Sequence, residues 1–249
     1  MSRDLWQTVR EAVEIDRINK KLTISNNSFQ CGPINASFVS RSSISSLRSP
    51  LYGSGQDLTI SATKITIDFY LKAFPTVGQT SWYLLKLLEA SGYGVTIQLT
   101  PDYITVNIIT SASTYSTSLT PKYGQWARYT VAVDTAANQA SVYIDGVLAG
   151  NITVTAGSFS TNTFALVFGN SEFLCYLNGN LNDVAIYNVR KDATAVSVLN
   201  THKGSTGTYS SGLVYFWTLR ETQNADVGAV NLTGTAGGSP TYDEDNYPF

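Results

Sequence analysis

Apolar and polar residues alternate through the middle of the chain, and residues 126–133 show this most clearly. Tyr129, Val131 and Val133 fall on one parity, while Arg128 and Thr130 fall on the other. This period of two predicts a half-buried β-strand. The small polar residues 134–138 predict a turn, and residues 141–144 predict a second strand. Asp145-Gly146 then predicts a hairpin, because both residues tolerate the positive φ of a type I′ turn.

More runs of the same kind occupy most of the chain after residue 57. Residues 82–88 are almost continuously apolar, which predicts a central strand. Pro101-Asp102 predicts a tight turn between two strands. The other runs are residues 64–73, 93–100, 103–110, 163–169 and 181–187. Short strands separated by turn signals at this spacing predict an all-β fold, a two-sheet antiparallel sandwich.

The clearest helical pattern lies at the N-terminus, over residues 2–21. Ser2 is a capping residue, an acidic residue lies in the first turn and two lysines lie in the last, as the helix dipole favours. A terminal helix either covers its own sandwich or docks on a neighbouring subunit or particle. Two offset apolar stripes favour a docking arm. Its assembly candidates are Leu5, Trp6, Val9 and Val13.

Residues 126–150 read Trp, a β run, Asp, a short loop and then Tyr-x-Asp-Gly, and residues 179–188 form a second motif. Both resemble laminin-G-like domains of the concanavalin A-like jelly-roll class. In the closing signature of that family the matching positions are Gly179, Leu181, Asp183, Val184, Ile186, Tyr187 and Asn188, followed by a short helix through about residue 199 that Asp192 would cap. The resemblance covers residues 65–199 and implies a jelly-roll sandwich of a recognition type.

The C-terminal segment resembles the opening strand of the same family, which usually stands at the start of the domain. Residues 212–221 carry this pattern, and residues 229–242 resemble the family segment that comes directly after the opening strand. Either residues 213–249 complete the sheets of the sandwich, or a truncated second copy begins here. The remaining length is too short for a second sandwich, so completion is favoured. The chain then divides into a helical arm (1–24), a Ser/Asn/Gly-rich loop or linker (25–57) and the sandwich (58–249).

Composition excludes several classes of partner. The net charge is −2, charged residues make up 14% of the chain, and no run of Lys or Arg occurs. A nucleic-acid or anionic-membrane surface is therefore not expected. No apolar stretch approaches the length of a membrane span. With Cys31, Cys175 and one histidine, His202, a zinc site is excluded and a single disulfide stays open.

We expect no enzyme activity and assign no catalytic residue. Retaining glycosidases need two carboxylates about 5 Å apart, and fold relatives carry them as Glu-x-Asp-x-x-Glu on one strand, a pattern that this sequence lacks. His202 beside a Gly/Ser linker supports no Ser/His/Asp arrangement, and phosphate-binding glycine motifs are missing.

The resemblance implies calcium or glycan binding at a loop rim. Calcium would need oxygen ligands, and Asp134 at a strand end is the metal candidate. Exposed aromatic side chains with polar neighbours bind sugars. The ligand-binding candidates are Tyr93, which lies between two glycines, and Tyr176 beside Asn178. The alternative is that these tyrosines fill the rim of the core.

Two functions fit these observations. In the first, the chain is a structural protein of a bacteriophage virion, a capsid decoration or tail appendage. Its arm contacts capsid or tail proteins, or another copy, while the lectin-like sandwich stabilises the particle or adheres to host glycans. The N-terminus lacks the apolar region of a secretory signal, which favours this function, with synthesis in the host cytoplasm. In the second, the chain is a free or cell-surface carbohydrate-binding module outside the cell.

Overall fold

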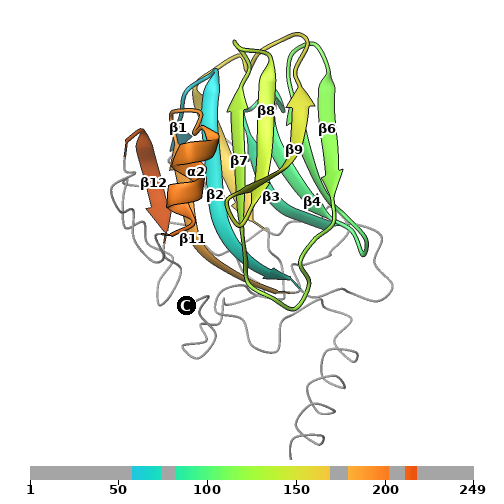
Figure 1. Cartoon of the computed structure of the whole chain (residues 1–249). Helices are drawn as coiled ribbons and strands as arrows, with labels where there is room; N and C mark the ends of the chain where they lie inside the picture. Colours follow the sequence, from blue (N-terminus) through green and yellow to red (C-terminus); the bar gives the residue numbers. More distant parts are fainter. Residues whose placement is uncertain (1–57, 74–81, 169–178, 202–210, 218–249) are drawn as a thin grey trace, which may run out of the picture.

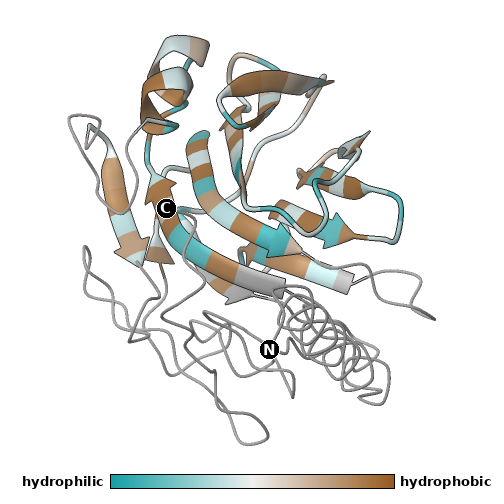
Figure 2. Cartoon of the chain, turned by 60° about the horizontal axis from the view of Figure 1, so that its bottom comes forward, coloured by the Kyte–Doolittle hydropathy of each residue, from teal (hydrophilic) through white to brown (hydrophobic). Residues whose placement is uncertain are grey.

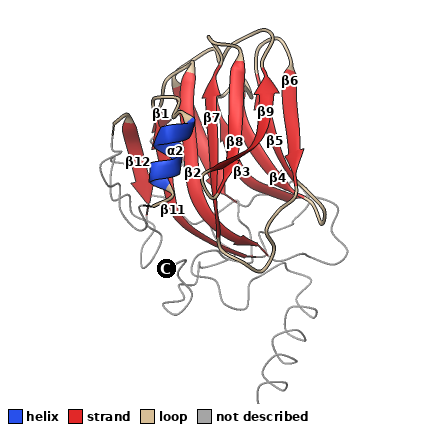
Figure 3. Cartoon of the chain, in the orientation of Figure 1, coloured by secondary structure: helices blue, strands red, loops and turns tan. Residues whose placement is uncertain are grey.

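The computed structural model describes residues 58–73, 82–168, 179–201 and 211–217, which form two six-stranded sheets packed face to face (Figures 1 and 3). The first sheet has the order β1 (Leu58–Thr59), β10 (Thr163–Phe168), β3 (Trp82–Leu88), β4 (Gly94–Leu99), β5 (Ile104–Ile109) and β6 (Thr114–Leu119). The second has the order β12 (Leu213–Trp217), β11 (Gly179–Tyr187), β2 (Lys64–Ala73), β7 (Ala127–Asp134), β8 (Gln139–Ile144) and β9 (Val147–Thr153). Neighbouring strands are antiparallel throughout, which confirms the predicted jelly-roll sandwich.

The core lies between the two sheets and follows the alternation of the sequence. On β5, Ile104, Val106 and Ile108 are buried and point inward, while Thr105 and Asn107 face out. Figure 2 shows the same alternation as brown and teal bands along the strands. The apolar strand β3 has neighbours on both sides, as predicted. Burial of these alternate apolar side chains is the main force that fixes the pairing register.

The second sheet is covered on its outer face as well, by helix α2 (Ala193–Leu199). Val196 of this helix packs on Ala132 and Tyr143, and Leu199 packs on a cluster that includes Phe216. Every residue of β7 is consequently buried. The prediction of a half-buried strand at residues 126–133 was therefore wrong, because the polar parity lies under a helix and is not exposed to water.

Local signals read from the sequence are confirmed at two places. Asp145 and Gly146 have φ of 51° and 79°, as a type I′ hairpin requires. Asp192 caps α2, and its side chain accepts a hydrogen bond from the backbone N–H of Ala195. No helix in the described part of the chain is long and apolar enough to cross a membrane.

The C-terminal strand joins the sandwich as the completion hypothesis predicts. Val184 of β11 pairs with Trp217 of β12, and Trp217 is fully buried in the core. The Thr59 N–H also donates a hydrogen bond to the Tyr215 hydroxyl (3.1 Å), which links the first sheet to the second. The predicted arm (1–24, with Leu5, Trp6, Val9 and Val13), the linker (25–57) and residues 218–249 lie outside the described residues, so the domain division stays a prediction.

Candidate functional site

The outer face of the first sheet carries a ladder of neutral polar side chains. Cross-strand register places Thr96, Asn107 and Ser116 in one row, and Gln98, Thr105 and Ser118 in the next. We call these six residues the polar face. Their alternate neighbours point into the core, so the face results from the same period of two that builds the sheet.

Hydrogen bonds across the strands order the polar face. The Asn107 amide donates from Nδ2 to Thr96 Oγ1 (3.0 Å), and its Oδ1 accepts from Ser116 Oγ (2.7 Å). The hydroxyls of Thr105 and Ser118 lie 2.9 Å apart. Hydroxyl groups of this kind both donate and accept, and they rotate to suit a ligand. Thr96 is itself buried, so the groups of the polar face that can reach a ligand are those of the other five residues.

Two aromatic side chains border this array. Tyr83 on β3 lies under the Lys86 ammonium, with Nζ 3.9 Å from the ring centroid. Tyr103 stands in the β4–β5 turn with the same parity as Thr105, and its side chain is 52% exposed. An exposed ring at the end of a hydroxyl ladder suits stacking on the apolar face of a sugar.

The turn that carries Tyr103 is fixed by several hydrogen bonds. Thr100 Oγ1 accepts from the backbone N–H groups of Asp102 (3.3 Å) and Tyr103 (2.9 Å). The Tyr123 hydroxyl donates to the Thr100 carbonyl oxygen, and burial raises the pKa of Tyr123 to about 12, so the hydroxyl keeps its proton at neutral pH. The turn is thus held in place while the Tyr103 ring remains in water.

Charge is nearly absent from this sheet. The six strands of the first sheet, as the structure describes them, contain no Asp or Glu and one cation, Lys86. A face without carboxylates has neither the acid nor the nucleophile that glycoside cleavage uses.

Tyr93 occupies the β3–β4 turn, between Gly92 (φ 87°) and Gly94 (φ 146°). Its backbone oxygen accepts from the Glu89 N–H, and its half-buried ring packs against the core. Tyr176 and Asn178 lie outside the described residues. The structure therefore places Tyr93 away from the polar face, and ligand binding by all three stays a prediction.

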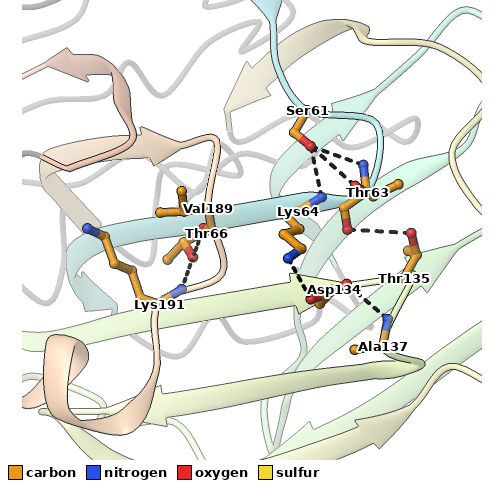
Figure 4. A network of polar contacts seen from close by, with 9 residues as sticks. All are labelled: Ser61, Thr63, Lys64, Thr66, Asp134, Thr135, Ala137, Val189 and Lys191. Atoms are coloured by element: carbon orange, nitrogen blue, oxygen red, sulfur yellow. Dashed lines mark hydrogen bonds and ion pairs between the residues drawn. The ribbon is translucent and has the colours of Figure 1, made fainter.

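Asp134 lies at the end of β7 within a network of turn contacts (Figure 4). Its Oδ1 accepts from the Ala137 N–H (3.0 Å), and its Oδ2 lies 3.6 Å from Lys64 Nζ. Both carboxylate oxygens thus have protein partners. In the part of the chain that the structure describes, no three His, Cys, Asp or Glu side chains gather as a metal site would require. Calcium would need several further oxygen ligands beside Asp134, and calcium binding there stays a prediction.

A buried ion pair, Arg128–Asp68, lies on the other sheet, under α2. Arg128 donates from Nε to both oxygens of Asp68 (3.1 and 2.9 Å) and from its second terminal nitrogen to Oδ2 (2.5 Å). Arg128 also donates to the carbonyl oxygen of Leu199 at the end of α2. Burial alone would lower the pKa of the Arg128 guanidinium, but the charge of Asp68 and its hydrogen bonds outweigh this effect. The pKa of Arg128 therefore lies above its usual value. This buried cluster clamps the helix to the sheet and has no access to a ligand.

The polar face was not recognised from the sequence, although a signal existed. Hydroxyl and amide residues alternate with apolar ones over residues 94–99 and 104–109, and with half-buried residues over 114–119. One strand with this pattern only indicates a solvent-exposed face. Three adjacent strands with it make a surface, and their adjacency is visible only in the folded sheet.

Comparisons with known proteins agree with this architecture. The sequence profile of the concanavalin A-like lectin/glucanases superfamily, in its laminin-G-like branch, matches residues 52–197, more than half of the 249 residues. No protein with a curated description matches the sequence.

Two of the similar solved structures are binding domains of bacterial toxins. The botulinum neurotoxin serotype G binding domain is 14% identical over 59% of this chain and 39% of that chain, with a TM-score of 0.47. The serotype D ligand-binding domain in complex with N-acetylneuraminic acid is 10% identical over 59% of this chain and 38% of that chain, with a TM-score of 0.48. The chain thus matches about two fifths of the length of these structures. On the profile match and the two-sheet fold, the chain belongs to the concanavalin A-like lectin/glucanase superfamily.

Proposed function

We propose that the chain is a lectin-like recognition module that binds neutral glycans on the polar face and does not cleave them. The observation that carries this proposal is the ordered array of hydroxyl and amide groups beside the exposed ring of Tyr103. Sugar hydroxyls match such an array, and stacking supplies an apolar contribution. The absence of carboxylates from the strands of this sheet supports binding without hydrolysis.

Binding to immobilised neutral polysaccharides and to a glycan array tests the proposal. Tyr103→Ala should weaken binding about tenfold, because a stacking ring is lost. Asn107→Ala should weaken binding as well, because the amide that links two strands of the polar face is lost. Ser197→Ala, on the exposed side of α2, is the matched control and should bind as the unaltered chain does. Binding that survives both polar-face changes would refute this location for the site.

We further propose that the chain is a bacteriophage virion protein, anchored through its N-terminal segment to capsid or tail proteins. The support is the apolar stripe of the predicted arm, with Trp6 as its largest side chain. Mass spectrometry of purified particles tests this location. Deletion of residues 1–22 should leave a folded chain that still binds glycan but no longer joins particles, and Trp6→Ala should lower occupancy about tenfold or more.

A free or cell-surface carbohydrate-binding module is the alternative function. It predicts glycan binding by a chain that is absent from purified particles. Incorporation that persists after deletion of residues 1–22, or a deletion variant that does not fold, would also contradict the anchoring role of the arm.

A further inference from the structure

The β4–β5 turn, which carries Tyr103, is closed by hydrogen bonds that all involve Thr100. The Thr100 N–H donates to the Tyr103 carbonyl oxygen (2.8 Å), and the Thr100 hydroxyl donates to the same oxygen (3.2 Å). Thr100 Oγ1 also accepts from the N–H groups of Asp102 and Tyr103. These bonds lie within the turn and set its internal shape. The orientation of the turn on the sandwich depends in addition on contacts from outside it.

Tyr123 supplies a contact of this kind. Its hydroxyl donates to the Thr100 carbonyl oxygen, and its half-buried ring packs against the core. Tyr123 belongs to the segment between β6 and β7, which crosses from the first sheet to the second (Figure 1). A hydroxyl on a packed ring holds its acceptor within a narrow range of positions. The Thr100 carbonyl is therefore fixed relative to the core as well as to its own strand.

The second sheet holds the backbone on both sides of Tyr123. The Lys122 N–H donates to the Tyr129 hydroxyl (3.1 Å), and the Gly124 N–H donates to the Ala73 carbonyl oxygen (2.8 Å). Tyr123 itself forms a parallel bridge with Ala73. The hydroxyl that reaches the turn of the first sheet thus extends from a backbone that β2 and β7 hold in place.

We propose that Tyr123 is a positioning residue of the glycan site, which through Thr100 holds the Tyr103 ring where it meets a sugar on the polar face. This inference rests on the function proposed above. Tyr123 makes no contact with the ligand in this role. Its hydroxyl reduces the freedom that the turn loses when a sugar stacks on Tyr103, and preorganisation of this kind raises affinity without a new contact.

Tyr123→Phe tests the proposal, because it removes the hydroxyl and keeps the packed ring. Soluble starch, xyloglucan and galactomannan are the probes, and affinity electrophoresis is the measurement. Affinity for any of these polysaccharides that the unaltered chain binds should fall about three- to tenfold.

Tyr115→Phe is the matched control. Tyr115 is a second half-buried tyrosine of the first sheet, and its hydroxyl donates to the Ala156 carbonyl oxygen (3.0 Å) and accepts from the Ala156 N–H (3.0 Å). It pairs with Ile108, at the end of β5 that lies away from the Tyr103 turn. Tyr115→Phe should lower the melting temperature at least as much as Tyr123→Phe, since more hydrogen bonds are lost. It should nevertheless bind as the unaltered chain does.

A double-mutant cycle separates positioning from a general loss of structure. If Tyr123 acts through Tyr103, Tyr123→Phe should have little further effect in the Tyr103→Ala chain, since the ring that it positions is gone. A general weakening of the sheet would instead lower affinity by the same factor in both backgrounds. That second result would overturn the proposal.

Amide hydrogen exchange of the chain without glycan supplies a measurement that does not depend on binding. The N–H groups of Asp102 and Tyr103 should exchange about severalfold faster in Tyr123→Phe than in the unaltered chain or in Tyr115→Phe. Thr100→Val removes the oxygen that accepts from both groups, so it should also speed their exchange and weaken binding. Thr100→Ser keeps this oxygen and should restore much of both.

Unchanged exchange at these two N–H groups in Tyr123→Phe would overturn the positioning role, even for a chain that binds glycan. Faster exchange with no loss of affinity would overturn it as well, because the turn would then move without consequence for the ligand. Failure of the unaltered chain to bind any neutral polysaccharide would refute the proposed function, and the role of Tyr123 in binding with it. The exchange rates would still show whether Tyr123 holds the turn, so the two failures are distinguishable.

Discussion

At the scale of single residues, two ion pairs of equal length differ in what surrounds them. Arg128–Asp68 and Lys122–Asp145 both have a shortest N···O distance of 2.5 Å. The side chains of the first pair are 5% and 1% exposed, and those of the second are 48% and 34% exposed. Water therefore screens the second pair and can solvate either partner alone, whereas neither partner of the first pair has that compensation.

Removal of one partner should consequently destabilise the fold far more at the first site than at the second. Arg128→Met leaves Asp68 as a buried unpaired carboxylate and should lower the free energy of unfolding by about 3–5 kcal/mol. Lys122→Met should lower it by less than about 1 kcal/mol. Denaturant unfolding at neutral pH measures both. Similar losses for the two variants would show that burial does not decide the strength of these pairs.

Glu89 is another buried charged residue, and its side chain holds a loop. Its Oε1 accepts from the backbone N–H of Ser160 (2.7 Å), and its Oε2 accepts from the Ser160 hydroxyl (2.6 Å). Burial alone would raise the pKa of Glu89, but the hydrogen bonds from Ser160 and Thr161 outweigh it, and the pKa lies below its usual value. The ionised form is therefore the form that the fold prefers.

This shift predicts a loss of stability in acid that depends on one residue. Because the pKa is lower in the folded state, the stabilisation is complete above the unfolded pKa of about 4.3 and is lost as the pH falls through the folded pKa. Glu89→Gln should be less stable than the unaltered chain at pH about 7 and should lose less stability on acidification. Urea unfolding midpoints between neutral and acidic pH measure this difference in stability. Asp102→Asn, on an exposed turn, is the control. Parallel pH profiles for Glu89→Gln and the unaltered chain would contradict the assignment.

Sequence reasoning succeeded for residues whose role is local and failed for those whose role depends on packing. Asp192 and Asp145-Gly146 act within a few residues of themselves, so their cap and turn were readable from the sequence. Arg128 lies on the polar parity of its strand, which indicates solvent. Its burial depends on Asp68 and on a helix more than 60 residues away in the chain, and no local pattern contains that information.

At the scale of elements, the strand that completes the sandwich is β12. The family match ends at residue 197, yet β12 pairs with β11 and places Trp217 in the core. Tyr215 stacks on Trp217 with ring centroids 5.7 Å apart, and its hydroxyl accepts from Thr59. The first and last strands of the described chain therefore meet at one edge of the sandwich.

If β12 is part of the sandwich, its buried Trp217 should contribute to the free energy of unfolding as other core residues do. Trp217→Ala should lower the free energy of unfolding by about 3–5 kcal/mol through lost burial and a cavity. Val214→Ala, on the same strand but half-buried, should cost about 1 kcal/mol. Denaturant unfolding distinguishes the two. A cost for Trp217→Ala no larger than that for Val214→Ala would mean that β12 is a dispensable addition.

The elements that were predicted and those that were missed differ in composition. β2, β3, β7 and β8 contain enough β-branched and aromatic residues for the pattern to stand out, and β12 was recognised by its likeness to an opening strand. β6 was not predicted, since most of its residues are small hydroxyls that are as common in loops. Pairing with β5 makes it a strand, and this pairing is a tertiary property.

At the scale of the whole molecule, the two sheets differ in their charge. The second sheet and its helix contain the buried Asp68–Arg128 pair and the acidic turns at Asp134 and Asp145, whereas the first sheet has Lys86 as the one charged side chain of its described strands. The outer face of the second sheet is covered by α2, whereas the outer face of the first sheet presents neutral hydrogen-bonding groups. This asymmetry separates the part of the molecule that stabilises the fold from the part proposed to bind.

The same asymmetry predicts how ligand binding responds to salt and what becomes of the ligand. Ionic interactions weaken as salt screens them, while stacking and neutral hydrogen bonds do not. Affinity for a neutral polysaccharide should therefore change little between about 0.05 and 0.5 M NaCl, over a range in which the Debye length falls severalfold. Prolonged incubation should release no reducing sugar, because cleavage needs a pair of carboxylates and the strands beneath the polar face have none. Binding assays across the salt series and a reducing-sugar assay on the same polysaccharide measure both. A steep loss of affinity in salt would indicate an acidic ligand and a different surface, and turnover abolished by changing one Asp or Glu would show that the chain is an enzyme.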